Sequence, residues 1–176
     1  LKAGDPFSAT VRALNAAGAV APNFGKESEG ATLTSSLVTP DPVTYPAASN
    51  PAPGNNAIPG TEFGAGGMVS DANGVATVDN LSWDEVGSIT LTANLTSGSY
   101  LGSGLTATGT SATVGPFIPH HFDTVVVASA SVPMPCPAGL TCPALYDGFV
   151  YSGQPFSMQV FARNLAGGTT ANYDGT

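Results

Sequence analysis

Gly4-Asp-Pro-Phe-Ser-Ala-Thr-Val-Arg-Ala-Leu-Asn-Ala-Ala-Gly18 decides the fold, because the chain repeats this stretch near its other end. The second copy reads Gly153-Gln-Pro-Phe-Ser-Met-Gln-Val-Phe-Ala-Arg-Asn-Leu-Ala-Gly167, and each residue follows its counterpart by 149 positions. Over residues 4–25, ten of 22 positions are identical between the copies. A repeat of this length has the size of a domain and exceeds the units of solenoids. We therefore interpret the chain as a window on a tandem array that starts inside one domain and ends inside the next.

The repeated stretch itself has the pattern of a half-buried strand. Apolar residues alternate with polar ones in the first copy, and the second copy keeps the alternation. Further strands are expected at residues 32–38, 74–79, 89–95, 105–114, 122–130 and 149–151. Strands at roughly ten-residue intervals, separated by Gly and Asn turns, are typical of antiparallel sandwiches. The prediction is an all-β chain of immunoglobulin-like antiparallel β-sandwich domains in tandem.

A domain boundary is expected at Gly115. Gly115-Pro-Phe-Ile-Pro119 is interpreted as a stiff junction whose prolines cannot extend a hydrogen-bonded ladder. Residues 1–114 would then form a β-sandwich domain that lacks its first strands, and residues 115–176 would supply the opening strands of the next repeat domain. The proline-rich residues 39–60 are expected to form a long surface excursion or a binding loop.

Composition narrows the classes of partner. Only 9% of residues are charged, against about 25% in typical soluble domains. The net charge is −8, and the four basic residues, Lys2, Arg12, Lys26 and Arg163, are scattered. Clustered lysine and arginine, which nucleic-acid and anionic-membrane binding require, are therefore lacking. No run of 18 apolar residues occurs, so no membrane insertion is expected in this segment.

Cys136 and Cys142 lie close together in Pro-Cys-Pro-Ala-Gly-Leu-Thr-Cys-Pro. Three interpretations are open: a local disulfide, two free thiols, or half of a metal site completed by His120 and His121. Five residues separate the cysteines, whereas thiolate zinc pairs usually have two to four between them. We expect the disulfide, which forms in an oxidising compartment.

Other candidate chemistry is weak, and no catalytic, cofactor-binding or metal residue is assigned. Adjacent His120 and His121 would point to opposite faces of a strand and could not easily share an ion. The acidic pairs Asp84-Glu85 and Glu27/Glu29 could serve calcium, but no EF-hand-like ligand string surrounds them. Trp83, the single tryptophan, leads a strand and is interpreted as a core residue.

Three stretches resemble a known family: Leu81-Ser-Trp-Asp-Glu-Val-Gly-Ser-Ile-Thr-Leu, Tyr100-Leu-Gly, and Val114-Gly-Pro-Phe-Ile-Pro-His-His-Phe-Asp. They are similar to the MshQ-like large bacterial surface proteins linked to biogenesis of the MSHA (mannose-sensitive haemagglutinin) pilus, and to the domain of unknown function found in them. The resemblance covers about residues 80–176, and residues 4–24 through the repeat. The chain departs from it at Pro116 and His120, where a basic and an acidic residue are expected.

A second resemblance, carried by Ser70-Asp-Ala-Asn-Gly-Val-Ala-Thr-Val, is to bacterial immunoglobulin-like domains of invasin-type adhesins. Together the resemblances imply a non-catalytic structural or adhesive module at the bacterial cell surface or on a pilus. The alternative is a carbohydrate-binding module or an accessory domain of a surface enzyme. Expected partners are neighbouring copies of the same protein, with pilus components or surface glycans as further candidates. Uncovered sheet edges would let copies assemble into filaments by strand exchange.

Overall fold

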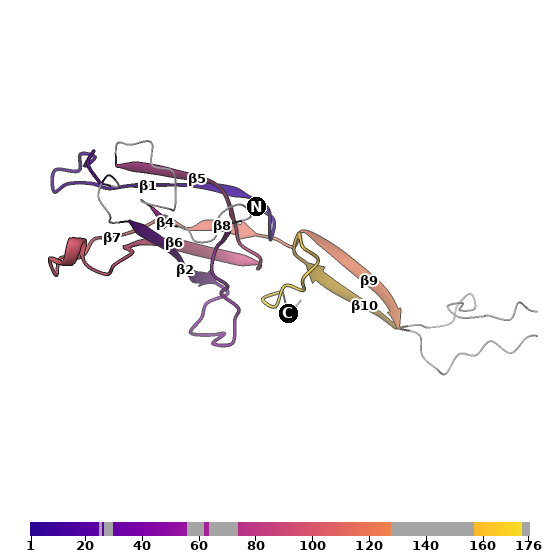
Figure 1. The fold of residues 1–176 in the computed structure, drawn as a ribbon. Helices are drawn as coiled ribbons and strands as arrows, with labels where there is room; N and C mark the ends of the chain where they lie inside the picture. Colours follow the sequence, from indigo (N-terminus) through magenta and orange to yellow (C-terminus); the bar gives the residue numbers. More distant parts are fainter. Residues whose placement is uncertain (25, 27–29, 56–61, 64–73, 128–156, 174–176) are drawn as a thin grey trace, which may run out of the picture.

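The structure is a computed structural model that describes the chain apart from residues 25, 27–29, 56–61, 64–73, 128–156 and 174–176. The described residues form antiparallel β-sheets, with one 3-10 turn at Tyr100–Gly102 (Figure 1). The predicted all-β class is therefore confirmed.

The first sheet has the strand order β1-β5-β3. It consists of β1 (Phe7–Arg12), β5 (Val75–Ser82) and β3 (Gly54–Asn55), all paired antiparallel. The side chains of β1 alternate between half-buried and exposed, as the sequence pattern predicts. Within the described residues, β1 is an edge strand of this sheet.

The second sheet has the order β4-β2-β6-β7, with β8 also paired to β6. Its strands are β4 (Glu62–Phe63), β2 (Ala31–Thr39), β6 (Gly87–Leu95), β7 (Thr108–Thr110) and β8 (Val114–Phe117). The β2–β6 ladder is the longest and runs from Ala31↔Leu95 to Thr39↔Ser88. Thr and Ser on its outer face and Leu and Ile on its inner face give it one buried side.

One hydrophobic core lies between these two sheets. Leu81, Trp83 and Ile89 are completely buried in it. The Trp83 indole packs against Phe117, with 5.2 Å between ring centroids, and donates a hydrogen bond to the Pro51 carbonyl. Trp83 is thus a core residue, as predicted, although it directly follows β5 and does not lead a strand, and the polar atom of its side chain is satisfied.

A third sheet is a two-stranded hairpin of β9 (His121–Val127) and β10 (Ser157–Arg163). It extends away from the other two sheets at the end where the chain leaves β8 (Figure 1). β10 begins one residue after the counterpart of the start of β1, so the repeat in the sequence is a repeat of the strand.

The expected strand at 105–114 is wrong over most of its length. Within it, Thr108–Thr110 and then Val114, the first residue of β8, pair with β6, and a glycine-rich turn precedes Thr108. The β7 ladder ends at Ser111, whose side-chain hydroxyl accepts the Leu91 N–H at 3.0 Å in place of a backbone carbonyl. A local side-chain acceptor of this kind competes with sheet pairing. The strand expected at 149–151 lies outside the described residues.

Two further expectations about prolines need correction. A ladder does continue past Pro116, because β8 pairs with β6 irregularly, through Gly87↔Phe117 and Ile89↔Val114. The 39–60 stretch is also not wholly a surface excursion. Pro51 accepts hydrogen bonds from Trp83 and from the Ser35 hydroxyl, and Gly54–Asn55 joins the first sheet as β3.

Candidate functional site at the repeat junction

The two repeat copies end in the same turn, bond for bond. In the first copy, Gly18 N donates to Asn15 O at 2.9 Å and Ala21 N donates to Ala13 O at 2.8 Å. In the second copy, 149 positions later, Gly167 N donates to Asn164 O and Thr170 N donates to Ala162 O, both at 3.0 Å. The repeated sequence therefore encodes a repeated strand-and-turn unit.

Asn and Gly at fixed positions explain why the turn is repeated. The Asn15 side-chain oxygen accepts the N–H groups of Ala17 and Ala19, and the Asn164 oxygen accepts that of Gly168. Gly18 and Gly167 have φ values of 78° and 84°, a region that glycine enters without steric cost. These identities were visible in the sequence, and the hydrogen bonds give them a structural role.

The second copy is docked onto the first two sheets through a buried carboxylate. Glu85 is 4% exposed and precedes β6. One of its oxygens accepts Ala171 N at 2.7 Å, and the other accepts Asn172 N at 3.1 Å and Val86 N at 2.9 Å. Backbone N–H donors thus compensate for the burial of this charge.

The Asn172 side chain adds further hydrogen bonds to the same contact. Its side-chain nitrogen donates to the carbonyls of Ser49 and Val86, at 2.8 and 3.2 Å, and its oxygen accepts Ser49 N at 2.7 Å. The Ser49 bonds tie the proline-rich segment to the second repeat copy. Asn172 corresponds to Asn23 of the first copy, so the repeat shows that the residue type is shared but does not show which residues Asn172 contacts.

A third set of bonds lies around the start of the chain. Leu165 N donates to Ala3 O at 2.9 Å, and Ala3 N donates to Ile118 O at 2.8 Å. The Asn164 side chain donates to Asp84 O at 3.3 Å and is 9% exposed. The hairpin is therefore held at three separate points, a geometry that opposes rotation about the connecting residues.

The same turn in the first copy is more exposed and lacks one backbone N–H group. Thr170 is 2% exposed, whereas its counterpart Ala21 is only half-buried. Pro22 stands where the second copy has Ala171, and proline has no N–H to donate. The first copy therefore cannot offer the same pair of backbone donors to a carboxylate like Glu85.

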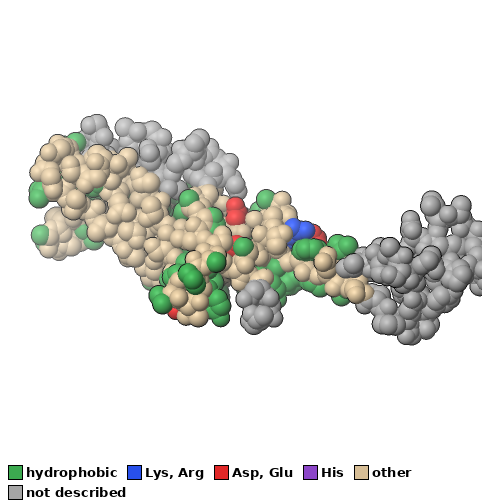
Figure 2. Space-filling view, turned by 90° about the horizontal axis from the view of Figure 1, so that it is seen from below, with side chains coloured by type: hydrophobic (Ala, Val, Ile, Leu, Met, Phe, Trp, Pro, Cys, Tyr) green, Lys and Arg blue, Asp and Glu red, His purple; other side chains and the backbone are tan. Residues whose placement is uncertain are grey.

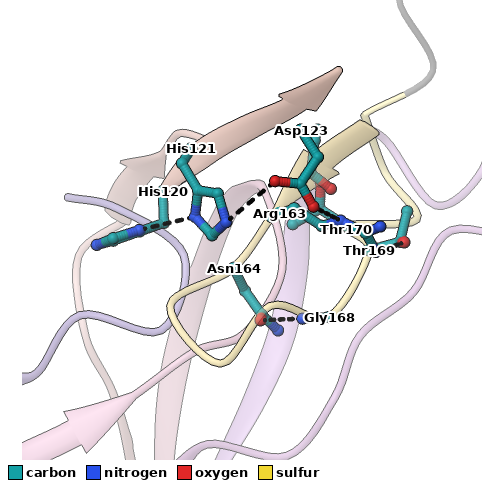
Figure 3. Close-up of polar contacts among 9 residues, drawn as sticks. His120, His121, Asp123, Arg163, Asn164, Gly168, Thr169 and Thr170 are labelled. Atoms are coloured by element: carbon teal, nitrogen blue, oxygen red, sulfur yellow. Dashed lines mark hydrogen bonds and ion pairs between the residues drawn. The ribbon is translucent and has the colours of Figure 1, made fainter. Parts of the chain in front are cut away.

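A polar cluster lies beside the turn that follows β10 (Figure 3). Arg163 Nε donates to Asp123 Oδ2 at 2.9 Å, and Arg163 also donates to the Thr169 hydroxyl. The Nδ1 atoms of His120 and His121 lie 3.0 Å apart. The expectation that these histidines point to opposite faces is wrong, because β9 begins at His121 and His120 precedes the regular strand.

The residues considered for a metal site or a disulfide are not brought together among the described residues. Among the described residues, no group of three or more His, Cys, Asp or Glu side chains is placed to hold a metal ion. Cys136 and Cys142 lie outside the described residues, as do Glu27 and Glu29, so the expected disulfide stays a prediction. In the part of the chain that the structure describes, no helix is long and apolar enough to cross a membrane.

The hairpin beyond the junction carries exposed apolar side chains. Phe122, Val125, Met158 and Val160 are between 49 and 55% exposed. Figure 2 shows hydrophobic side chains along this arm and few charged ones on the same face. An exposed apolar arm of this kind is typical of a surface that is covered by another element.

Comparison with known families matches one model, the third domain of DUF6701, over residues 85–176. The match begins at the junction carboxylate Glu85 and continues through β10, so it spans the contact described above. It covers 92 of the 176 residues, which is more than half. Comparison with curated proteins and with solved structures gave no match. On the strength of the family match, this chain belongs to the DUF6701 family.

Proposed function

We propose that this chain is a non-catalytic structural and adhesive module of a bacterial cell-surface or pilus-associated tandem-repeat protein, built from immunoglobulin-like β-sandwich units. The observation that carries the proposal is the junction centred on Glu85. Backbone and side-chain bonds fix the second repeat copy to the first unit. In an array whose units contact only their neighbours, such interfaces between successive units contribute directly to the stability of the whole.

The surface chemistry supports the same proposal. The few charged residues and the net charge of −8 leave a polar, weakly charged exterior. The resemblance to MshQ-like surface proteins provides the link to a pilus and to an extracellular location. We therefore expect neighbouring copies or domains of the same protein as the first partners.

The alternative function, a carbohydrate-binding module or accessory domain of a surface enzyme, requires exposed aromatic rings that stack on sugars. Trp83, the single tryptophan, is completely buried and does not supply one, and the exposed rings among the described residues are Tyr and Phe, such as Tyr45 and Phe122. A glycan array separates the two functions, because binding of the chain to a defined glycan would favour the alternative.

The location is tested by labelling intact bacteria that carry the parent protein. Antibodies raised against the folded chain are expected to label cells without permeabilisation, while antibodies against a cytoplasmic protein label only permeabilised cells. If the chain is detected only after permeabilisation, the proposed surface function is wrong.

A further inference from the structure

We propose that the free edge of β1 binds residues His121–Val127 of a second copy of this chain as an additional antiparallel strand, in exchange for the pairing of these residues with their own β10. The proposal deepens the proposed function, on which it rests, by naming the partner and the surface that joins it. Its starting point is that β1 and β10 are the same element of the repeat, yet each is paired on only one edge within the described residues.

The two pairings use opposite edges of that element. Ala13 N donates to Gly74 O, so the backbone N–H of Ala13 points towards β5. His120 N donates to Arg163 O, so the backbone carbonyl of Arg163 points towards β9. Arg163 is the counterpart of Leu14, the neighbour of Ala13, and successive residues of an antiparallel strand face opposite neighbours. A β9-type strand would therefore lie on β1 opposite β5, where the described residues place no strand.

The register follows from the repeat. In the hairpin, Asp123 is opposite Phe161, Thr124 is opposite Val160 and Phe122 is opposite Ala162. Moved back by 149 positions, these partners become Arg12, Val11 and Ala13. Asp123 would then lie directly across from Arg12, one of only four basic residues in the chain. Opposite charges in directly opposed positions stabilise a strand pair.

A groove is present where the strand would enter. A cavity of about 660 Å³ lies between β1 and β7, with mostly apolar walls that include Val11, Leu91, Ala93 and Leu105. Val11 and Ala13 line it, so the side chains opposite them, Thr124 and Phe122, would enter the cavity. Phe122 is 50% exposed in its own hairpin and would be covered in the groove.

An aromatic contact gives an independent check of this placement. In the hairpin, Phe122 packs on Tyr173, with 5.5 Å between ring centroids. The counterpart of Tyr173 in the first copy is Phe24, which lines the cavity. An incoming Phe122 opposite Ala13 would therefore meet an aromatic ring in the place where it meets one now.

The test uses the full chain and a labelled peptide with the sequence of residues 119–129. Fluorescence anisotropy is expected to show saturable binding, whereas a peptide of the same composition in scrambled order does not bind. Hydrogen exchange then locates the peptide. Protection is expected to rise at Thr10 and Arg12, whose N–H groups face the free edge, and to stay unchanged at Val11, which faces β5.

Charge exchange tests the register. Arg12→Glu is expected to weaken binding about tenfold, because it replaces an attractive cross-strand pair by a repulsive one. A peptide carrying Asp123→Lys should restore binding to that variant to within about threefold. Lys2→Glu makes the same change of charge away from β1 and should leave binding unaffected. Equal weakening by Arg12→Glu and Lys2→Glu would overturn the register.

Sedimentation of the unlabelled chain identifies the natural occupant. The chain is expected to self-associate, and excess peptide should dissociate the complexes. A chain that stays monomeric well above the dissociation constant of the peptide would overturn the second copy as occupant, and an absence of peptide binding would overturn the proposal as a whole. Neither result changes the labelling of intact cells, so failure here is distinguishable from failure of the proposed function.

Discussion

Replacing Glu85 by alanine should release the second repeat copy from the first unit without unfolding either sheet. The Glu85 carboxylate accepts two N–H groups from across the junction, those of Ala171 and Asn172, at 2.7 and 3.1 Å. Hydrogen bonds to charged groups contribute about 1.5–3 kcal/mol each, and donors left without an acceptor lose that contribution. Because water can enter the space left by the side chain, we take the lower end, about 3 kcal/mol for the pair.

Hydrogen exchange at Leu165 measures this opening directly. Leu165 N donates to Ala3 O across the junction, so its amide exchanges when the copy undocks. A loss of about 3 kcal/mol raises the opening constant about 100-fold, since each 1.4 kcal/mol is a factor of ten. Amides in the β2–β6 ladder should exchange at their original rates.

The matched control is Asp84→Asn, which removes a neighbouring carboxylate charge. The Asp84 side chain is exposed and makes no hydrogen bond in the described residues, because only its backbone carbonyl binds Asn164. Its effect on Leu165 exchange should be within about 0.5 kcal/mol. If Glu85→Ala leaves Leu165 exchange unchanged, or if Asp84→Asn accelerates it equally, the role assigned to Glu85 is refuted.

Three further predictions concern the turns, a loop carboxylate and the cysteines. Asn15→Ala should lower the free energy of unfolding by about 1 kcal/mol. Asn164→Ala should accelerate Leu165 exchange more than Asn15→Ala does, because Asn164 also bonds to Asp84 O across the junction. Equal effects of the two variants on that exchange would argue against the junction role of Asn164. The Thr44 hydroxyl, followed by the Val43 N–H, holds the pKa of Asp41 below its usual value. This stabilisation of the loop is present above the unfolded pKa and is lost as the pH falls through the lower folded pKa. Carboxyl chemical shifts followed by NMR should show the Asp41 pKa rising in Thr44→Val, and an unchanged pKa would contradict the cause given. Mass spectrometry of the unreduced protein should find Cys136 and Cys142 joined, and two alkylatable thiols would end that prediction.

The sequence was most informative where one face of a strand is buried. Alternation in residues 7–13 and 89–95 predicts β1 and β6, because inward apolar residues such as Leu91 contribute to the core. The strand expected at 105–114 failed for a local reason. Thr and Val favour strands by propensity, but the Ser111 hydroxyl takes the Leu91 N–H from the ladder, and the pairing with β6 is interrupted until Val114.

The junction could be predicted only in part. The identity of Asn23 and Asn172 marks a position that the repeat retains, yet no local pattern shows that Glu85 receives the second copy. That contact joins residues more than 80 positions apart, and sequence periodicity carries no information at such a separation. Glu85 beside Asp84 therefore suggested a cation ligand, while the structure surrounds it with backbone donors.

Residual dipolar couplings test the central claim most directly, namely that the second repeat copy is rigidly docked on the first unit. Backbone amide couplings would be measured for β1, β5 and β6, and for β9 and β10, in one weakly aligned sample. If the docking is rigid, one alignment tensor of one magnitude fits both groups in the geometry of Figure 1. A separate tensor for β9 and β10, or couplings there scaled towards zero, would mean that the hairpin moves independently and would contradict the account.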